Sequence, residues 1–532
     1  MKLIKYIFVL CLVSTALISC RKDLGNYEYH EINDLKVSGI EEEYIITAGQ
    51  NLNLKPVLDF SKDPSFSANN YTFEWISFNL AAILTEQRKS LYKNQNFDIP
   101  FPLGIGSYTL FYVVTEKSTG ISWNKSFKVK VNGIYKGGWG VLSEVNSQSR
   151  LDYFEYDHAT GTYPKEYRDF TSLFSDASTG KGLTLPGKPK YLAGWSNRTA
   201  ATGTAFKYFL YVGTDKITEK LNLTDGFIWK EDYAFRFESA GSSALNTVDY
   251  IKPVGSGSAY SYLNGDVFYR YDSFQYLFGT PINKLTNSSY FQVSSHTAVS
   301  RYSTVNTVIL MYDITNKRFV RNVNSALTSV TPLAYTAGTS AFDPNNVGMD
   351  LVWMDQTLAY GGRAYAVLKD ANSKYYLARM NNAAAFLAYA WDDISSLPEI
   401  NKATCFAVDQ QYGYLFYSVD GKLYQYDVDS KQTKLMKDLG TERITVLKYN
   451  LGNAVSLTIA TNPTYATTYG KRFISVITDL IVGTYDPSNP NSSGKVKIYQ
   501  VPQFNADLIT EFEFGGFGKV ADVAAAETPL GW

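Results

Sequence analysis

The chain has 532 residues, with 50 basic and 50 acidic side chains, three histidines and three cysteines. This length allows two or more domains with buried cores, and a formal net charge of zero lacks the positive excess typical of nucleic-acid binders. With 42 Tyr and 31 Phe, the composition favours β-sheet, and it excludes a small disulfide scaffold and a multispan membrane protein.

The first residues have the layout of an export signal, which is removed from the mature protein. Two lysines precede an apolar run over 7–18 that is too short to span a bilayer. The run closes on Ser19-Cys20, and small residues before a cysteine resemble the bacterial lipobox, whose cysteine is lipidated and becomes the new N-terminus. We therefore predict a signal peptide over 1–19, a lipid anchor on Cys20 and a polar tether over 20–34. An ordinary secretory signal with a chance cysteine is the alternative.

The tether begins with Arg21-Lys22-Asp23. It partly resembles the charged export signal of surface lipoproteins in gut Bacteroidetes, with fewer acidic residues than is usual. The resemblance implies a lipid-anchored protein of the outer membrane that is exposed at the cell surface, with membrane lipid as its first partner.

Cysteine usage agrees with this expectation. Once Cys11 leaves with the signal and Cys20 carries lipid, Cys405 is the single cysteine left, so no intrachain disulfide can form. Cys405 lies in a strand-like run, where a buried and inert thiol is expected. A nucleophilic role would need a partner histidine, and the nearest one, His296, is far away in sequence.

Residues 35–133 are predicted to form one small all-β domain. Apolar and polar residues alternate over 52–57 and 71–75, as they do in half-buried strands. Two further strands are expected over 106–114 and 127–131. Such a domain without a disulfide needs large side chains at its centre, and these strands supply them.

The strand of Trp75 and the strand that starts Gly106-Ser107-Tyr108 resemble the PKD-like, immunoglobulin-type domain of Bacteroidetes surface lipoproteins. The Trp-Asp-Phe-Gly-Asp-Gly signature of ordinary PKD domains is absent, because Glu74-Trp75-Ile76-Ser77 stands in its place. The resemblance therefore implies a β-sandwich but no particular loop chemistry.

From 135 to 532 a sequence motif recurs. It consists of an aromatic strand that ends in Tyr-Asp or a similar pair, followed by a polar turn. The copies lie near 151–157, 208–213, 265–272, 308–313, 375–379, 421–429 and 495–500. Seven copies give about 57 residues each, against the 40–50 of propeller blades, so long loops are expected between blades. The prediction is an all-β chain, a sandwich followed by a β-propeller of about seven blades; a run of further sandwiches is the alternative. One Ala-rich segment, 381–390, is a helix candidate.

Residues for metal, triad or phosphate chemistry are few. The three histidines, His30, His158 and His296, are scattered, so no zinc site is expected, and no Gly-x-Ser-x-Gly elbow is present. We expect no cofactor and no metal. The loop 486–491 is oxygen-rich and loosely resembles a calcium loop, but its Pro, Asn and Ser content also marks a plain loop, which is the interpretation that we favour.

Paired carboxylates are the remaining route to catalysis. Glycoside hydrolysis needs two carboxylates across a cleft, and four aspartates in predicted loops are candidates: Asp350, Asp355, Asp392 and Asp393. Loop aspartates are commonly turn formers, so the chain is not expected to be an enzyme.

Aromatic surface is the remaining candidate for a site. Four tryptophans lie near Gly, Asn or Asp residues, which suggests loops: Trp195, Trp229, Trp353 and Trp391. Aromatic faces stack on sugar rings or grip apolar peptide side chains, so these four are the predicted ligand-binding residues. Most tryptophans in a β-rich protein are nevertheless core residues.

The layout of sandwich plus propeller behind a lipobox resembles the PKD-like family lipoproteins that accompany SusC/SusD-type, TonB-dependent nutrient importers. This resemblance implies a surface accessory that captures a glycan or peptide ligand for the importer, without nucleic acid as a partner. A propeller-type glycan hydrolase or lyase is one alternative, and a structural adhesin or scaffold is another.

Overall fold

The structure is a computed structural model that describes residues 33–450 and 477–526. Short gaps interrupt this range at 48, 64, 79–87, 104–105, 134, 136, 158–159, 161, 177–178, 198–206, 241–244, 255–256, 272–276, 301–307, 324–327 and 382–386. The chain divides into two compact units, 1–131 and 132–532. The described part contains no helix with the length and apolarity needed to cross a bilayer.

The first unit is a β-sandwich of two sheets. One sheet pairs β1 (Leu35–Ser38) with β3 (Val57–Phe60). The other has the order β2 (Glu43–Thr47), β7 (Ser122–Asn132), β6 (Gly106–Glu116), β4 (Tyr71–Phe78) and β5 (Arg88–Tyr92), and η1 (Ala68–Asn70) precedes β4.

The centre of the sandwich is aromatic. The Trp75 and Tyr112 rings are fully buried, with centroids 4.3 Å apart, and Trp75 Nε1 donates a hydrogen bond of 2.8 Å to the Asn94 carbonyl. Phe127, from β7 of the same sheet, meets Trp75 edge-on. The predicted strand tryptophan thus fills the centre and has its one polar atom satisfied.

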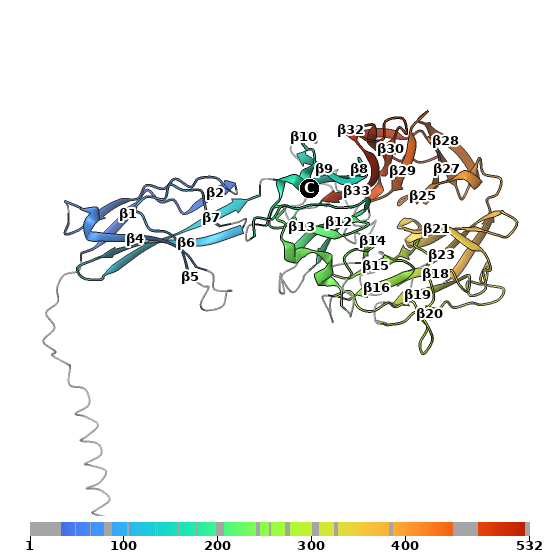
Figure 1. Cartoon of the computed structure of the whole chain (residues 1–532), viewed down its shortest axis with the longest axis horizontal. Coiled ribbons are helices and arrows are strands. Elements are labelled where there is room, and N and C mark those ends of the chain that lie inside the picture. The colour runs from blue at the N-terminus through green and yellow to red at the C-terminus, as the bar shows by residue number, and fades with distance from the viewer. Residues whose placement is uncertain are drawn as a thin grey trace, which may run out of the picture. The chain divides into compact units, whose positions relative to one another are not determined.

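The described residues of the second unit form seven antiparallel sheets, which are the blades of a propeller (Figure 1). Blade 1 has the order β10 (Thr162–Tyr167), β9 (Gln148–Asp157), β8 (Gly138–Val145) and β33 (Lys519–Ala526). Blade 2 contains β11 (Pro189–Asn197), β12 (Lys207–Thr214) and β13 (Thr218–Asn222). Blade 3 contains β14 (Tyr250–Pro253), β15 (Ala259–Leu263) and β16 (Asp266–Arg270). Blade 4 contains β17 (Ala298–Val299), β18 (Val308–Asp313), β19 (Arg318–Val323) and β20 (Thr331–Pro332).

The last three blades resemble blades 2 to 4, with the strands in chain order from the inner strand outwards. Blade 5 contains β21 (Asp350–Thr357), β22 (Arg363–Lys369), β23 (Tyr375–Asn381) and β24 (Leu387–Asp393). Blade 6 contains β25 (Cys405–Val408), β26 (Leu415–Val419), β27 (Lys422–Asp427) and β28 (Gln432–Asp438). Blade 7 contains β29 (Arg443–Lys448), β30 (Leu480–Tyr485), β31 (Gly494–Gln500) and β32 (Ile509–Phe517). Short 3-10 turns lie between strands: η2 (Phe170–Leu173), η3 (Glu231–Tyr233), η4 (Phe235–Glu238), η5 (Ala359–Gly361) and η6 (Ile400–Lys402).

Hydrophobic cores between neighbouring blades close the ring. Each of seven buried clusters joins two consecutive blades, and the last joins blade 7 to blade 1 through Val446, Ile481 and Trp139. Consecutive residues of a strand face opposite neighbours, so Phe416 enters the core shared with blade 7 and Tyr417 the core shared with blade 5. Both faces of every blade are covered by a neighbouring blade, so Tyr and Phe side chains are buried on both faces. The predicted all-β architecture, a sandwich followed by a seven-bladed propeller, is confirmed.

Two local expectations can be compared with this fold. The Ala-rich segment 381–390 is not a helix where it is described, because it belongs to β23 and β24, and Ala388 pairs with Met380. The Tyr-Asp motif marks the end of a strand and the start of a turn, as predicted. Asp313, at the end of β18, accepts hydrogen bonds from the backbone N–H groups of Thr315 and Asn316, at 3.1 and 2.9 Å.

Candidate functional site

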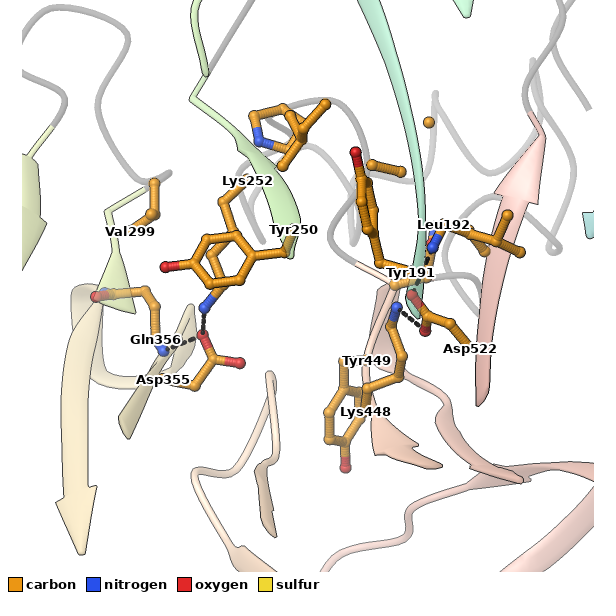
Figure 2. Close-up of a pocket in the computed structure, with 16 residues that line it drawn as sticks. Tyr191, Leu192, Tyr250, Lys252, Val299, Asp355, Gln356, Lys448, Tyr449 and Asp522 are labelled. Atoms are coloured by element: carbon orange, nitrogen blue, oxygen red, sulfur yellow. Dashed lines mark hydrogen bonds and ion pairs between the residues drawn. The ribbon is translucent and has the colours of Figure 1, made fainter. Parts of the chain in front are cut away.

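The innermost strands of the propeller line a central pocket, which we call the channel pocket. Its walls come from β11, β14, β21 and β33, from Val299 in β17, and from the end of β29 with the residues after it. Two ion pairs lie on different sides of this pocket (Figure 2). Lys252 Nζ lies 3.4 Å from Asp355 Oδ1, and Lys448 Nζ lies 2.7 Å from Asp522 Oδ1.

Backbone contacts hold both pairs in place. Asp522 accepts hydrogen bonds of 2.8 Å from the backbone N–H groups of Leu192, in the next blade, and of Val523. Lys252 Nζ also donates to the Thr297 carbonyl and lies 5.4 Å from the centroid of the Tyr250 ring. Because their partners are fixed, these charges are preorganised, and the four together have no net charge.

Asn450, directly after β29, contributes a buried amide with an unused donor. Its side chain is 6% exposed, and its Oδ1 accepts a hydrogen bond of 3.2 Å from the Ala525 N–H group. No group among the described residues is a hydrogen-bond partner of its Nδ2, although Asn450 lines the channel pocket. An unsatisfied buried donor costs about 1–3 kcal/mol, so a ligand that brings an acceptor oxygen to it regains that free energy.

A second pocket lies further along the channel, at the other ends of the inner strands, and Lys448 lines both pockets. It brings together His296 and Cys405, which are far apart in sequence. Burial lowers the pKa of His296 to about 4, and burial raises the pKa of the Cys405 thiol. These shifts favour a neutral imidazole beside a protonated thiol, which is the opposite of what a nucleophilic cysteine needs.

The four predicted tryptophans are spread around the propeller, and none of them lines the channel pocket. Three of them lie in strands rather than in the predicted loops: Trp195 in β11, Trp353 in β21 and Trp391 in β24. Trp195 is fully buried between blades 2 and 3. Trp353 is 7% exposed, stacks on Phe406 and lines the pocket of His296. Trp391 packs partly buried against Tyr376 and Phe342.

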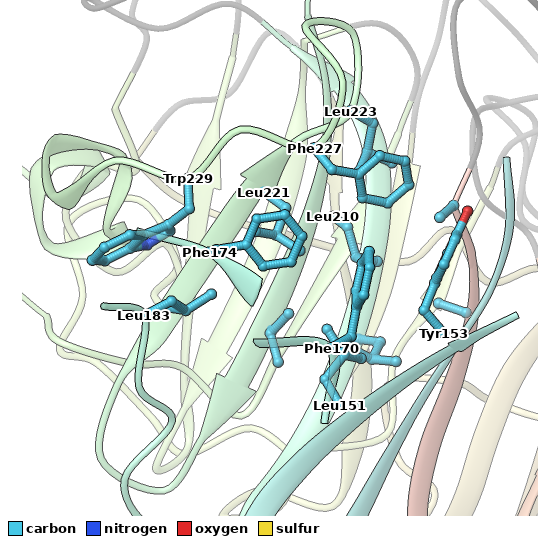
Figure 3. Close-up of a cluster of buried hydrophobic side chains, with 14 of the residues drawn as sticks. Leu151, Tyr153, Phe170, Phe174, Leu183, Leu210, Leu221, Leu223, Phe227 and Trp229 are labelled. Carbon is cyan, nitrogen blue, oxygen red and sulfur yellow. The ribbon is translucent and has the colours of Figure 1, made fainter. Parts of the chain in front are cut away.

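Trp229 follows β13 and points into the core between blades 1 and 2 (Figure 3). It is 3% exposed, and its Nε1 donates a hydrogen bond of 3.0 Å to Glu219. Like Trp195, it offers no free ring face to a ligand. The prediction that these tryptophans lie in loops was wrong for three of them. Gly, Asn and Asp also occur at strand ends, next to tryptophans that still belong to the strand.

The candidate carboxylates are not paired across a cleft. Asp350 and Asp355 belong to the same strand, β21, and each lies beside a lysine. Asp392, in β24, forms ion pairs with Arg379 at 3.0 Å and Lys431 at 2.6 Å. Asp393 accepts a hydrogen bond from the Ser395 N–H group.

The oxygen-rich loop 486–491 is arranged as a turn. Asp486 Oδ1 accepts hydrogen bonds from the backbone and hydroxyl of Ser488, at 2.9 and 2.7 Å. Among the described residues, no group of three or more His, Cys, Asp or Glu side chains is placed to hold a metal ion. Cys20, His30 and His158 lie outside the described residues.

The sequence interpretation missed Lys252, Lys448, Asp522 and Asn450. Their signal is a charged or amide side chain within or next to an apolar inner strand, as in Val446-Leu447-Lys448 and Ala521-Asp522-Val523. The sequence alone does not show which group pairs with such a charged side chain. The partners are found only when the ring closes and β33 meets β29 and β11.

One family model is similar to the N-terminal part of the chain. The PKD-like family model matches residues 20–189, about a third of the chain, and the match begins at the cysteine predicted to carry lipid. A search of curated proteins finds no match.

Solved structures of low similarity are also found. The extracellular domain of a one-component system from B. thetaiotaomicron is 11% identical, with a TM-score of 0.35, over 63% of this chain and 37% of that one. The chain thus spans well under half of that structure's length. Apo AztD from Citrobacter koseri is 10% identical, with a TM-score of 0.35, over 74% of this chain and 98% of that one. The fucose-specific lectin from Aleuria aurantia is 12% identical, with a TM-score of 0.26, over 57% and 95%. TM-scores of this size do not establish a common fold.

Proposed function

We propose that this protein is a lipid-anchored outer-membrane protein whose propeller binds a glycan or peptide ligand without turnover, as an accessory to a TonB-dependent nutrient importer. The observation that carries the binding role is the unsatisfied Nδ2 donor of Asn450 in the wall of the channel pocket. A buried polar group without a partner calls for an explanation, and for Asn450, which lines a pocket, the explanation that we propose is a ligand that supplies the acceptor.

The charges of the channel pocket support a ligand without net charge. Its two lysines each lie beside an aspartate, so the pocket offers donors and acceptors in balance. A polyanion would meet Asp355 and Asp522 and a polycation would meet the two lysines. Hydroxyl groups of a sugar, or the amide groups of a peptide, suit this arrangement better.

The state of the reactive groups supports the proposed absence of turnover. The Cys405 thiol and the His296 imidazole have pKa values shifted away from a reactive pair, in both cases mainly by burial. The aspartates considered for glycoside hydrolysis are tied to cations or to turns. A hydrolase needs one free carboxylic acid and one free carboxylate across the bond that it cleaves.

The test is a binding screen of the 21–532 fragment against glycans and peptides, followed by the variant Asn450→Asp. This change keeps the oxygen that accepts from Ala525, replaces the free donor with an acceptor oxygen, and adds a negative charge to the pocket when the carboxyl ionises. It should weaken binding of the best ligand by about 1–3 kcal/mol. The matched control is Asn372→Asp, in the exposed turn between β22 and β23, which should leave affinity unchanged. Equal affinity in both variants would remove Asn450 from the site.

The anchor and the partner are tested in cells. Replacing Cys20 with Ala should abolish lipid labelling and release the protein from the membrane fraction, and membrane association that persists in this variant contradicts the anchor. Purification of the tagged wild-type chain from membranes should recover a SusC/SusD-type importer. Its absence in cross-linked samples contradicts the accessory role.

A further inference from the structure

A third pocket lies where loops of blades 5, 6 and 7 meet, and we call it the aromatic cradle. Its lining includes Tyr360, Gln411, Tyr412, Asp429, Gln503 and Phe504. These residues come from the β21–β22, β25–β26, β27–β28 and β31–β32 connections. In each blade these connections leave the propeller at the rim where the inner strands end, which is the rim nearer to the channel pocket.

Phe504 is the most exposed large apolar residue of the described chain, at 90%. Its φ of 59° lies in the left-handed region, and so does the φ of 53° at Asn505. Such a backbone costs free energy for a bulky residue and persists only where the surroundings hold it. Asn505 supplies that hold, because its side chain accepts a hydrogen bond of 2.6 Å from Gln425 and donates one of 3.3 Å to Asp427. The phenyl ring is therefore presented to solvent on a fixed loop.

Tyr360 also lines the cradle and is also held in an unusual backbone conformation, with a φ of 54°. Its hydroxyl lies 2.7 Å from Asp429 Oδ2 and 3.0 Å from the Tyr412 carbonyl oxygen. The ring crosses Gly413 so closely that a Cβ there would lie 2.4 Å from it. The tyrosine ring is thus fixed over the neighbouring blade and remains 42% exposed.

We propose that the aromatic cradle binds a neutral sugar ring of a glycan, which would narrow the proposed function from a glycan or peptide to a glycan. The inference rests on that proposed function. Aromatic faces stack on the C–H face of a sugar ring, and stacking area on rigid side chains costs little conformational entropy. Asp429, which accepts from Tyr360, also lines the cradle, and so do Gln411 and Gln503, whose side chains are hydrogen-bonded with Tyr412. A carboxylate and two amides retain further acceptor and donor capacity for hydroxyl groups. A carboxylate in the cradle disfavours an anionic ligand.

Hydrogen bonds connect the cradle with the channel pocket. Gln410, next to Gln411, donates to the carbonyl of Gln356 at 3.1 Å, and Tyr449 donates to Asp409 at 3.1 Å. Gln356 and Tyr449 both line the channel pocket. The loop that carries Gln411 and Tyr412 is therefore fixed to the wall of that pocket, on the same rim of the propeller.

The test measures binding of four neutral oligosaccharides, cellohexaose, xylohexaose, mannohexaose and laminarihexaose, and of a pool of neutral hexapeptides, to the 21–532 fragment. At least one oligosaccharide should bind, and Phe504→Ala should weaken that binding at least ten-fold. Asp429→Asn keeps an acceptor for Tyr360 and should weaken it several-fold. The control Phe237→Ala removes another exposed ring, 54% exposed, from the turn η4 and should leave the affinity within two-fold.

The remaining outcomes separate this inference from the proposed function. If an oligosaccharide binds and responds to Asn450→Asp but to neither cradle variant, the cradle is not a site and the proposed function stands. If only peptides bind, and Phe504→Ala weakens them, the sugar assignment is wrong. If neither oligosaccharides nor peptides bind, both proposals fail.

Discussion

At the scale of single residues, the propeller buries one carboxylate between two cations. Glu238, in η4, contacts Lys220 Nζ and accepts a hydrogen bond of 3.0 Å from Arg270 Nη1, and all three side chains are at most 4% exposed. Tyr211 donates to the same carboxylate at 2.8 Å. Charges removed from water in this way are stable only while the set is complete.

Glu238→Gln should therefore be strongly destabilising, because it leaves Lys220 and Arg270 buried without a counter-charge. We expect the free energy of unfolding to fall by about 3–5 kcal/mol, measured by denaturant titration. The matched control is Glu231→Gln, which breaks a solvent-exposed ion pair with Lys181 and should leave the midpoint nearly unchanged. Similar midpoints for the two variants would mean that the stability of the propeller does not depend on the charge of Glu238.

His296 makes stability depend on pH. Burial and the nearby Lys252 lower its pKa from the usual 6.5 to about 4, against the opposing effect of Asp355. Between these two values the unfolded chain binds a proton that the folded chain does not, so stability rises with pH across this window, by up to about 3 kcal/mol. His296→Gln should remove this rise.

The measurement is the unfolding midpoint of both proteins at several pH values from 4 to 7. Burial raises the pKa of Asp409 to about 6, which makes stability fall as pH rises through nearly the same window. Both proteins contain Asp409, so the difference between them isolates His296. A difference that stays constant with pH would show that the imidazole titrates normally in the folded state.

At the scale of elements, the propeller is closed by its last strand. The innermost strand of blade 1, β33, comes from the C-terminal end of the described chain and pairs with β8, from the start of the propeller. It also carries Asp522 into the channel pocket. One strand thus joins the two ends of the ring and completes the candidate site.

Truncation before β33, after residue 518, should prevent cooperative folding of the propeller, because Val520, Val523 and Ala525 leave the core between blades 7 and 1. Thermal unfolding followed by circular dichroism should lose its sharp transition. The control is truncation after residue 526, which keeps β33 whole and should retain the wild-type midpoint. A sharp transition in the shorter chain would mean that six complete blades are enough.

The elements were more predictable than the site, for a physical reason. Alternation along a strand is a local pattern, so the sandwich strands and the seven repeats can be read from neighbouring residues. The prediction of a helix in the Ala-rich segment was wrong because small side chains also occur in sheets that pack closely. Ala364, Ala366 and Ala378 are packed in this way between blades 4 and 5. The channel pocket unites residues from 191 to 524, which only the closure of the ring brings together.

At the scale of the whole molecule, the two compact units have separate cores. The sandwich encloses its own aromatic cluster around Trp75, and the propeller cores lie between its blades. Units that bury their own apolar surface generally fold on their own.

We therefore expect the fragments 21–131 and 132–532 to fold separately, each with a cooperative transition in calorimetry. The sum of the two traces should reproduce the trace of the joined chain, and a heteronuclear NMR spectrum of the smaller fragment should be well dispersed. An insoluble 132–532 fragment would show that the propeller requires the sandwich.

The central claim is that the propeller binds a ligand and releases it unchanged. The most direct measurement is a calorimetric titration of the purified 21–532 chain with the best ligand of the screen, followed by chromatography of the recovered ligand. We predict a saturable isotherm that Asn450→Asp weakens, and a ligand that is recovered intact after prolonged incubation. Cleavage products that disappear when Asp392 or Asp393 is replaced would contradict the account and assign an enzyme instead.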